Sequence, residues 1–212
     1  MDKIYDYQCY LFDFDGVIVD TVEIKAQAFA EIYRPCGDNV VEQILAHHRA
    51  NGGASRIEKF RYYHQKFLNK RINDSDMRAL SEKFSAYSFK KILIAPLVRG
   101  AEEFLNNLRQ LDKKIFIVSS APEEEIKKVI LKKQLKKHFC GIKGAPLSKH
   151  ENINQIRDKY NFDAAACVFF GDAAEDQRAA ESHNIKFVPI NYFDKSCGYP
   201  DFRALIDAQN QT

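Results

Sequence analysis

The sequence predicts an α/β fold, a three-layer, Rossmann-like parallel sheet core with a small α-helical cap domain inserted into it. Short runs rich in β-branched and aromatic residues alternate with amphipathic helical patterns, which is typical of a parallel sheet covered by helices. Roughly 100 residues separate the first two of these runs, far more than the ~12 that a crossover between parallel strands needs. An insertion is therefore expected between the first two strands.

Each expected strand is a short apolar run. Four such runs lie at Cys9–Phe14, Ile115–Val118, Cys167–Phe170 and Lys186–Ile190, and a weaker one lies at Phe139–Lys143. The insertion carries helical patterns at Glu23–Tyr33, Val40–Ala50, Ser55–Asn69 and Ser75–Lys90, separated by Gly52-Gly53 and Asn73-Asp74. We therefore expect a core from residues 1–20 and 95–212 and a helical cap from residues 21–94.

Composition excludes several classes of protein. The 212 residues are 45% hydrophobic and 29% charged, which is typical of a globular protein rather than a disordered one. A net charge of +3 is too small to indicate a nucleic-acid binder. The longest apolar stretch, Ala164–Phe170, is far shorter than the ~20 residues of a membrane span. We expect no nucleic-acid or membrane partner.

The expected location is the cytoplasm. The N-terminus carries acidic residues within its apolar stretch and lacks a small-residue cleavage site, unlike a secretory signal. The five cysteines are widely scattered and form no CxxC pair, which argues against a disulfide framework or a zinc ribbon. We expect them to be mostly buried thiols of a reducing compartment.

Two acids follow the first expected strand. Strand alternation places Asp13 and Asp15 on one face, at the carboxyl edge where open α/β sheets bind ligands, and Gly16 allows a tight turn after them. Two converging carboxylates repel each other unless a cation or a proton neutralises them. The pair is therefore a candidate for a hard metal ion with a proton-sharing acid beside it.

The other expected strand ends also carry polar residues. The second strand ends in Ser119 and Ser120, and the segment from Ser120 to Glu123 has the pattern of a capping box, so Ser119 is the better placed of the two to contact an anion. A second capping box begins at Ser148 and places Lys149 in a first helical turn. A cation there opposes the helix dipole, which favours pairing with the acids or with a bound phosphate.

Two more acids lie at the same predicted edge. Asp172 follows the strand that ends at Phe170, and Asp176 lies one turn into the next helix, whereas Glu175 is typical of an ordinary helix N-terminus. Four acids, a serine and a lysine at successive strand ends form a combination that capping alone does not explain.

With these motifs in order, the sequence resembles the haloacid dehalogenase superfamily over nearly its whole length, specifically the aspartate-dependent phosphatases with a helical cap. The segments DFDGVIVDT, IFIVSS, Lys149 and GDAAED are similar to the nucleophile, phosphate-binding, lysine and metal-binding motifs of that family. The resemblance implies a magnesium-dependent phosphatase that hydrolyses a small phosphorylated metabolite, a sugar phosphate or phosphoglycolate-like acid, through an aspartyl-phosphate intermediate.

The resemblance also assigns roles to residues. It implies that Asp13 is the nucleophile and that Asp15 protonates the leaving group and then activates water. Phosphate oxygens would be held by Ser119, Ser120 and Lys149, although Ser120 stands where the family often has asparagine. Magnesium would be held by Asp13, the backbone carbonyl of Asp15 and Asp172, with Asp176 holding a water on the metal or orienting Lys149.

Substrate specificity is expected to lie in the cap. The segment from His47 to Arg56 resembles the specificity loop of the family by position, and Arg49, Gly53 and Arg56 are its candidate residues. Lys59 and the histidines are less favoured. The lysine-rich stretch from Lys127 to Lys137 is most simply a solvated helix face.

The sequence leaves three hypotheses for function open. Retention of both Asp13 and Asp15 argues against the dehalogenase and phosphonate-cleaving branches. The alternatives to a phosphatase are a phosphomutase of the β-phosphoglucomutase type, which uses the same aspartates, and a catalytically weak binding or interaction module. The expected partner is a small phosphorylated metabolite, and the expected state is a monomer or a weak homodimer.

Overall fold

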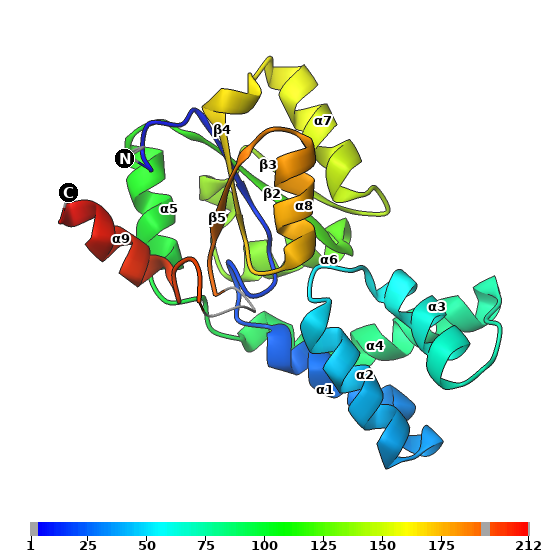
Figure 1. Cartoon of the computed structure of the whole chain (residues 1–212). Helices are drawn as coiled ribbons and strands as arrows, with labels where there is room; N and C mark the ends of the chain where they lie inside the picture. The colour runs from blue at the N-terminus through cyan, green and yellow to red at the C-terminus, as the bar shows by residue number, and fades with distance from the viewer. Residues whose placement is uncertain (1–3, 192–195, 212) are drawn as a thin grey trace.

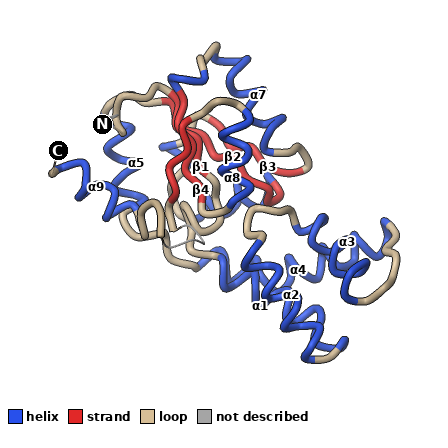
Figure 2. Tube along the Cα trace, in the orientation of Figure 1, coloured by secondary structure: helices blue, strands red, loops and turns tan. Residues whose placement is uncertain are grey.

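The computed structural model describes residues 4–191 and 196–211, and its centre is a sheet of five parallel strands (Figures 1 and 2). The strand order is β3-β2-β1-β4-β5. The strands are β1 (Cys9–Phe12), β2 (Lys114–Pro122), β3 (Gly141–Ala145), β4 (Cys167–Gly171) and β5 (Lys186–Pro189). The predicted α/β class with a parallel sheet is confirmed.

Strand β1 lies at the middle of the sheet and pairs with both β2 and β4. In this register Phe12 lies opposite Ile117 and Phe170, so the segments that follow the three strands leave the sheet at one edge. The chain crosses to one side of β1 after its first strand and to the other side after its third, and open α/β sheets bind ligands at such a switch point. The predicted polar residues therefore meet at this edge.

Strand β2 is longer than predicted and includes both serines. It continues to Pro122, and the following helix begins at Glu123 without any capping hydrogen bond from a side chain. The predicted helix cap at Ser120 is therefore wrong. The cause is pairing with the neighbouring strand, because Pro122 lies opposite Ala145 of β3 after a register shift. Extended pairing thus holds the serines in the sheet.

Helices cover both faces of the sheet. On one face, β-strand residues such as Phe12 and Ile117 pack with α5, α6 and α9, and on the other face Leu11 and Phe169 pack with α7 and α8. These helices are α5 (Ala101–Gln110), α6 (Glu123–Lys132), α7 (Lys149–Tyr160), α8 (Ala174–Ser182) and α9 (Phe202–Asn210), and short 3-10 helices lie at Lys136–His138 and Ala164–Ala166. The result is three layers, as Figure 1 shows.

The insertion between β1 and β2 forms a group of helices beside one end of the sheet (Figure 1). Its helices are α1 (Val22–Tyr33), α2 (Asp38–Ala50), α3 (Arg56–Phe67) and α4 (Asp74–Ile94), with a short 3-10 helix at Arg34–Cys36. They have a hydrophobic core of their own, in which the Phe29 and Phe84 ring centroids lie 4.7 Å apart. This separate core supports our proposed division into a cap, residues 21–94, and a core, residues 1–20 and 95–212.

The two connections between cap and core run side by side. Val19 and Leu97 form an antiparallel bridge, the Asp20 amide donates to the Pro96 carbonyl at 3.0 Å, and the Val98 amide donates to the Ile18 carbonyl at 3.1 Å. These backbone hydrogen bonds join both connections into one short ribbon directly after the acid-bearing loop.

The burial of the cysteines differs from the prediction. Cys9 and Cys167 are buried, but Cys36, Cys140 and Cys197 are exposed, so the prediction of mostly buried thiols is wrong. Cys36 ends the short 3-10 helix at Arg34–Cys36, which has no buried residues, and Cys140 and Cys197 lie in connecting segments, where burial is not required. In the part of the chain that is described, no helix combines the length and the apolar character that crossing a membrane requires.

Candidate active site

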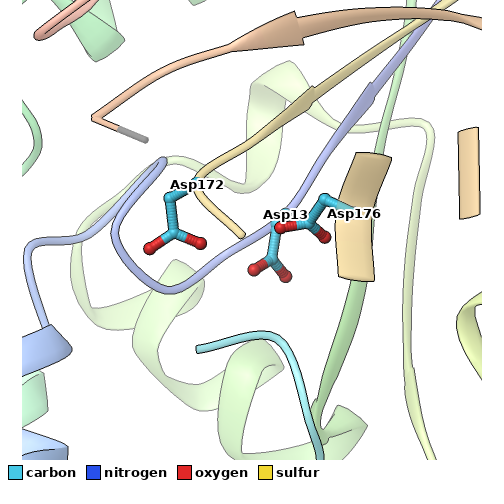
Figure 3. Close-up of side chains that lie close together, drawn as sticks. All are labelled: Asp13, Asp172 and Asp176. Carbon is cyan, nitrogen blue, oxygen red and sulfur yellow. The ribbon is translucent and has the colours of Figure 1, made fainter. Parts of the chain in front are cut away.

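Three carboxylates gather at the carboxyl edge of the sheet (Figure 3). Asp13 directly follows β1, Asp172 directly follows β4, and Asp176 lies in the first turn of α8. One oxygen atom from each carboxylate lies within 4.8 Å of the other two. Asp13 and Asp176 are buried and Asp172 is half-buried. The structure therefore brings together three of the four acids that the sequence predicted for this edge.

Lys149 is the cation beside these acids. Its ammonium nitrogen lies 3.4 Å from Asp13 Oδ1 and forms a close ion pair with Asp176 Oδ1. It lies in the first turn of α7, where Ser148 and Glu151 form the predicted capping box. The expected pairing of Lys149 with the acids is confirmed by these contacts. Burial alone would lower the pKa of Lys149, but the charges of Asp13 and Asp176 outweigh it and raise that pKa.

One lysine does not neutralise the whole group of acids. Burial, together with the negative charges of Asp176 and Asp15, raises the pKa of Asp13 to about 7 although Lys149 opposes the shift. Burial and the charges of Asp176 and Asp13 raise the pKa of Asp172 well above its usual range. The raised carboxyl pKa values show that Lys149 alone does not offset the burial and mutual repulsion of these acids. A cation that binds there would favour the ionised forms.

The donor set fits magnesium. Mg²⁺ prefers oxygen ligands and is commonly held by one or two carboxylates together with substrate phosphate. In the described residues, Asp13 Oδ1 is buried and accepts no hydrogen bond, which leaves it available to a cation. The carboxylates of Asp172 and Asp176 complete the group. These three residues could therefore hold the ion.

Asp15 has a different environment from the other acids. Its carboxylate accepts a hydrogen bond from Thr21 Oγ1 at 2.6 Å and forms a close ion pair with Lys25. Burial alone would raise the pKa of Asp15, but the charge and hydrogen bond of Lys25 and the hydrogen bond of Thr21 lower it overall. The Asp15 side chain is thus paired with the cap, and a metal contact through its backbone carbonyl stays a prediction.

Sequence reasoning missed Lys25. The residue lies in the first turn of α1, where a cation opposes the helix dipole as it does at Lys149. The argument that singled out Lys149 could therefore have found Lys25 as well.

A small, partly open cavity lies between these acids and the cap. Its volume is about 50 Å³, enough for about three to five water molecules. The sheet edge contributes Asp13, Asp15, Ser119, Ser120, Ala121 and Asp172, and the cap contributes Val22, Lys25, Phe29, His48, Gly52, Gly53, Ala54, Ser55, Arg56, Lys59 and Phe84. Both predicted serines thus line the cavity, and Ser119 is buried.

Two glycines allow close approach around the cavity. Gly16 has a φ of +73°, a conformation that other residues rarely adopt, and a β-carbon there would collide with the carboxylate of Asp172. A β-carbon on Gly53 would come within 2.8 Å of the β-carbon of Glu175. Gly53 thus lets the cap loop pass tightly over the start of α8. The predicted tight turn at Gly16 is confirmed.

The two candidate arginines of the cap have different positions. Arg56 lines the cavity, but its guanidinium is paired with Glu125 of α6 at 2.6 Å and contacts Ser85 Oγ at 2.7 Å. Arg49 is exposed, lies 3.9 Å from a carboxylate oxygen of Glu23 and is absent from the cavity wall. Contact of either arginine with the substrate stays a prediction, and the position of Arg56 supports it better.

Lys59 lines the cavity, although the sequence gave it less weight. It is 3% exposed, and its ammonium nitrogen lies 2.9 Å from His48 Nδ1 and 3.2 Å from the Gly52 carbonyl oxygen. Its helix face also carries Phe60 and Tyr63, which belong to the core of the cap. A lysine at helical spacing within an apolar stripe was the signal that could have found it.

Comparison with known proteins agrees with this arrangement. The model of the haloacid dehalogenase-like hydrolase family matches residues 10–190. A phosphoglycolate phosphatase from Colwellia psychrerythraea strain 34H is 22% identical over 200 residues, which cover 90% of this chain and 87% of the relative.

Two solved structures have the same fold. A predicted phosphoglycolate phosphatase from Haemophilus somnus 129pt has a TM-score of 0.74 at 16% identity, covering 96% of this chain and 98% of the other. A beta-phosphoglucomutase from Clostridium difficile has a TM-score of 0.74 at 18% identity, covering 97% and 98%. Because the family match runs from β1 through the inserted helices to the end of β5, this chain belongs to the haloacid dehalogenase-like hydrolases.

Proposed function

We propose that this hydrolase is a magnesium-dependent phosphatase that cleaves a small phosphorylated metabolite through an aspartyl phosphate on Asp13. The observation that carries the proposal is the group of Asp13, Asp172 and Asp176 around one buried lysine, Lys149. A carboxylate that is ionised at neutral pH can attack phosphorus without a separate base. Bound magnesium would keep Asp13 ionised and neutralise charge on the phosphoryl group.

The first half-reaction would form the aspartyl phosphate. A carboxylate oxygen of Asp13 attacks phosphorus, the bond from phosphorus to the leaving oxygen breaks, and Asp15 gives a proton to that oxygen. Lys149 and the Ser119 hydroxyl hold phosphoryl oxygens, and Ser120 lies beside them on the cavity wall. Positive charge and fixed donors matter here because negative charge develops on the phosphoryl oxygens as the bond breaks.

The second half-reaction would release phosphate. Asp15 takes a proton from water, the water oxygen attacks phosphorus, and the bond between phosphorus and Asp13 breaks. The lowered pKa of Asp15 fits this step, because the carboxylate is ionised before it accepts the proton. Donation in the first half-reaction requires the protonated form, so the ion pair with Lys25 has to open and Asp15 has to take up a proton before the leaving oxygen receives it. Lys25 and Thr21 hold the Asp15 carboxylate in place through the ion pair and the hydrogen bond described above.

The proposed substrate class is a sugar phosphate or a phosphoglycolate-like acid. A cavity of about 50 Å³ favours a short leaving group when the cap is in this position. The names of the relatives, phosphoglycolate phosphatase and beta-phosphoglucomutase, suggest the same two classes. A cytoplasmic location and a monomeric or weakly dimeric state stay predictions from the sequence.

A phosphomutase is the second candidate function. It is favoured by the similarity in fold to the beta-phosphoglucomutase of Clostridium difficile, with a TM-score of 0.74. Such an enzyme would use Asp13 and Asp15 in the same way but return the phosphoryl group to a sugar. Isomerised product after priming with a sugar bisphosphate, with little release of phosphate, would identify it.

The test is phosphate release from a panel of phosphorylated sugars, polyols, small acids and nucleotides. Each substrate is assayed with magnesium and with chelator, using Asp13→Asn as the inactive variant. Asp112→Asn is the matched control, because Asp112 has an almost fully exposed side chain and lies before the start of β2, at the other end of that strand from Ser119. We expect turnover that is lost with chelator and in Asp13→Asn but kept in Asp112→Asn. Turnover that survives in folded Asp13→Asn would overturn the aspartyl-phosphate mechanism.

A further inference from the structure

Lys59 is a buried lysine whose contacts do not compensate its charge. Its nitrogen contacts a histidine nitrogen, a carbonyl oxygen and, at 5.8 Å, the ring centroid of Phe29. None of these groups is an anion. Burial and the charges of Lys59 and Lys25 lower the pKa of His48 to about 2, so His48 is a neutral neighbour of the lysine. In the described residues, Lys59 forms no ion pair with a carboxylate.

The other cations on the cavity wall are already paired. Lys25 pairs with Asp15, and Arg56 pairs with Glu125. Lys149, at the sheet edge, pairs with Asp13 and Asp176. Among the described residues that surround the cavity, Lys59 is thus the basic side chain that forms no ion pair with an acid, and it belongs to the cap helix α3.

The lowered pKa of Lys59 agrees with the absence of a paired anion among the described residues. Burial and then the charge of Lys25 lower the pKa of Lys59 to about 7, while the more distant Glu175, Asp15 and Asp172 oppose the shift. A buried ammonium without a paired anion is unfavourable, and an anion that enters the cavity would remove that penalty. The aromatic rings of Phe29 and Phe84 also line the cavity and exclude water from such a contact.

We infer that Lys59 is a specificity-determining residue that binds a negatively charged group on the leaving group of the substrate. The inference rests on the proposed phosphatase function and narrows it to phosphate monoesters whose leaving group carries a carboxylate or a second phosphate. The phosphoryl group to be cleaved lies at the sheet edge with Asp13 and Lys149, and the second anion lies at the cap with Lys59. The small cavity limits the chain between the two groups to a short one.

The test compares esters that have the same number of carbon atoms and differ in this charge. One pair is 2-phosphoglycolate and 2-hydroxyethyl phosphate, and the other is propane-1,3-diol bisphosphate and 3-hydroxypropyl phosphate. The values of kcat and KM are measured for the wild type, for Lys59→Met and for Lys66→Met. Lys66 lies on the same helix α3 but is exposed, so it is the matched control.

We expect the wild type to favour at least one charged ester over its neutral partner by about tenfold or more in kcat/KM. Lys59→Met should reduce this ratio to about one, mainly by raising KM for the charged ester. The neutral ester should keep its kcat/KM within about twofold, and Lys66→Met should behave as the wild type. The pair that shows the preference distinguishes a carboxylate from a second phosphate.

A binding measurement separates this inference from the proposed function. Calorimetric titration of Asp13→Asn and of Asp13→Asn with Lys59→Met, using the same ester pairs, detects the contact without any turnover. If no ester is hydrolysed but charged esters still bind through Lys59, the proposed function fails and the inference survives. If esters are hydrolysed without preference for charge, or if the preference persists in Lys59→Met, the inference is overturned.

The variant is expected to fold. Methionine has a similar length, and replacing a buried charge by an apolar side chain is often neutral or stabilising. Circular dichroism and thermal unfolding check this expectation. Lys59→Gln serves as a second variant, since it keeps a donor without the charge and should also lose the preference for the charged ester.

Discussion

The cap and the core are joined beside the cavity by a cluster of three polar side chains. Arg56 of α3 pairs with Glu125 of α6 at 2.6 Å, Ser85 of α4 donates to the other Glu125 oxygen at 2.8 Å, and Arg56 donates to Ser85 at 2.7 Å. The Arg56 side chain is 9% exposed and that of Glu125 is 25% exposed. The cluster therefore stabilises the observed position of the cap on the core, and Glu125→Gln should weaken it.

The size of the effect follows from this geometry. A hydrogen bond to a charged group contributes about 1.5–3 kcal/mol, whereas an exposed ion pair contributes about 0–1 kcal/mol. Glutamine keeps one acceptor for Arg56 or Ser85, and Glu125 is partly exposed, so a loss of about 1–2 kcal/mol is expected. That loss corresponds to about a 5- to 30-fold shift in the equilibrium between this position of the cap and positions that lack the cluster. KM should rise by up to about this factor. The value of kcat should stay within about threefold, because the substitution leaves all the carboxylates of the active site in place.

The assay is steady-state kinetics with the best substrate of the panel, together with thermal unfolding to show that each variant is folded. Glu124→Gln is the matched control, because Glu124 lies on the same helix, is 75% exposed and pairs with Lys127 within that helix. Equal KM values for folded Glu125→Gln and Glu124→Gln would refute the reasoning, since the cluster would then not stabilise the position of the cap on the core.

Three further predictions concern stability. Lys149→Met leaves the buried acids without their cation, so urea unfolding in chelator should show a loss of about 3–5 kcal/mol that magnesium partly restores; equal stability of variant and wild type would contradict this. Burial raises the pKa of Asp13 to about 7, so between about pH 4 and pH 7 the metal-free folded protein binds more protons than the unfolded protein, and its stability falls as pH rises through that window. Urea unfolding in chelator at pH 5 and pH 7 should show this loss, and Asp13→Asn, which cannot ionise there, should show less of it. Phe29→Ala removes a ring from the core of the cap and should lower the free energy of unfolding by about 3–5 kcal/mol; a thermal midpoint equal to that of the wild type would argue against a shared core.

The sheet and its acids could be predicted because local patterns determine them. Apolar runs bury strands, and parallel strands place Asp13 and Asp172 at one edge whatever the connections are. The capping box at Ser148 was predictable for the same reason, because its partners are three residues apart. Local patterns failed at Ser120, where pairing between β2 and β3 extends the strand beyond the expected helix start.

The cap side of the site depends on contacts that are distant in the sequence. Lys59 is buried against Phe29 and His48, which belong to two other helices, and Arg56 meets Glu125 from the opposite side of the cavity. The apolar stripe of α3 makes Lys59 a candidate, but no local pattern specifies that such a lysine faces the cavity. Only the packing of the four cap helices on one another and on α6 separates Lys59 from the many solvated lysines of the chain.

The ribbon formed by the two connections has a consequence for exchange of the whole insertion. Because Val19 is bridged to Leu97, the two ends of the inserted segment lie within hydrogen-bonding distance of each other. A tight turn would be enough to connect these two ends. The pairing of the strands therefore does not depend on the length of the segment inserted between them. A different module could be grafted at this ribbon while β1 and β2 keep their places. The same sheet, with the same acids at its carboxyl edge, could therefore carry different inserted cap domains.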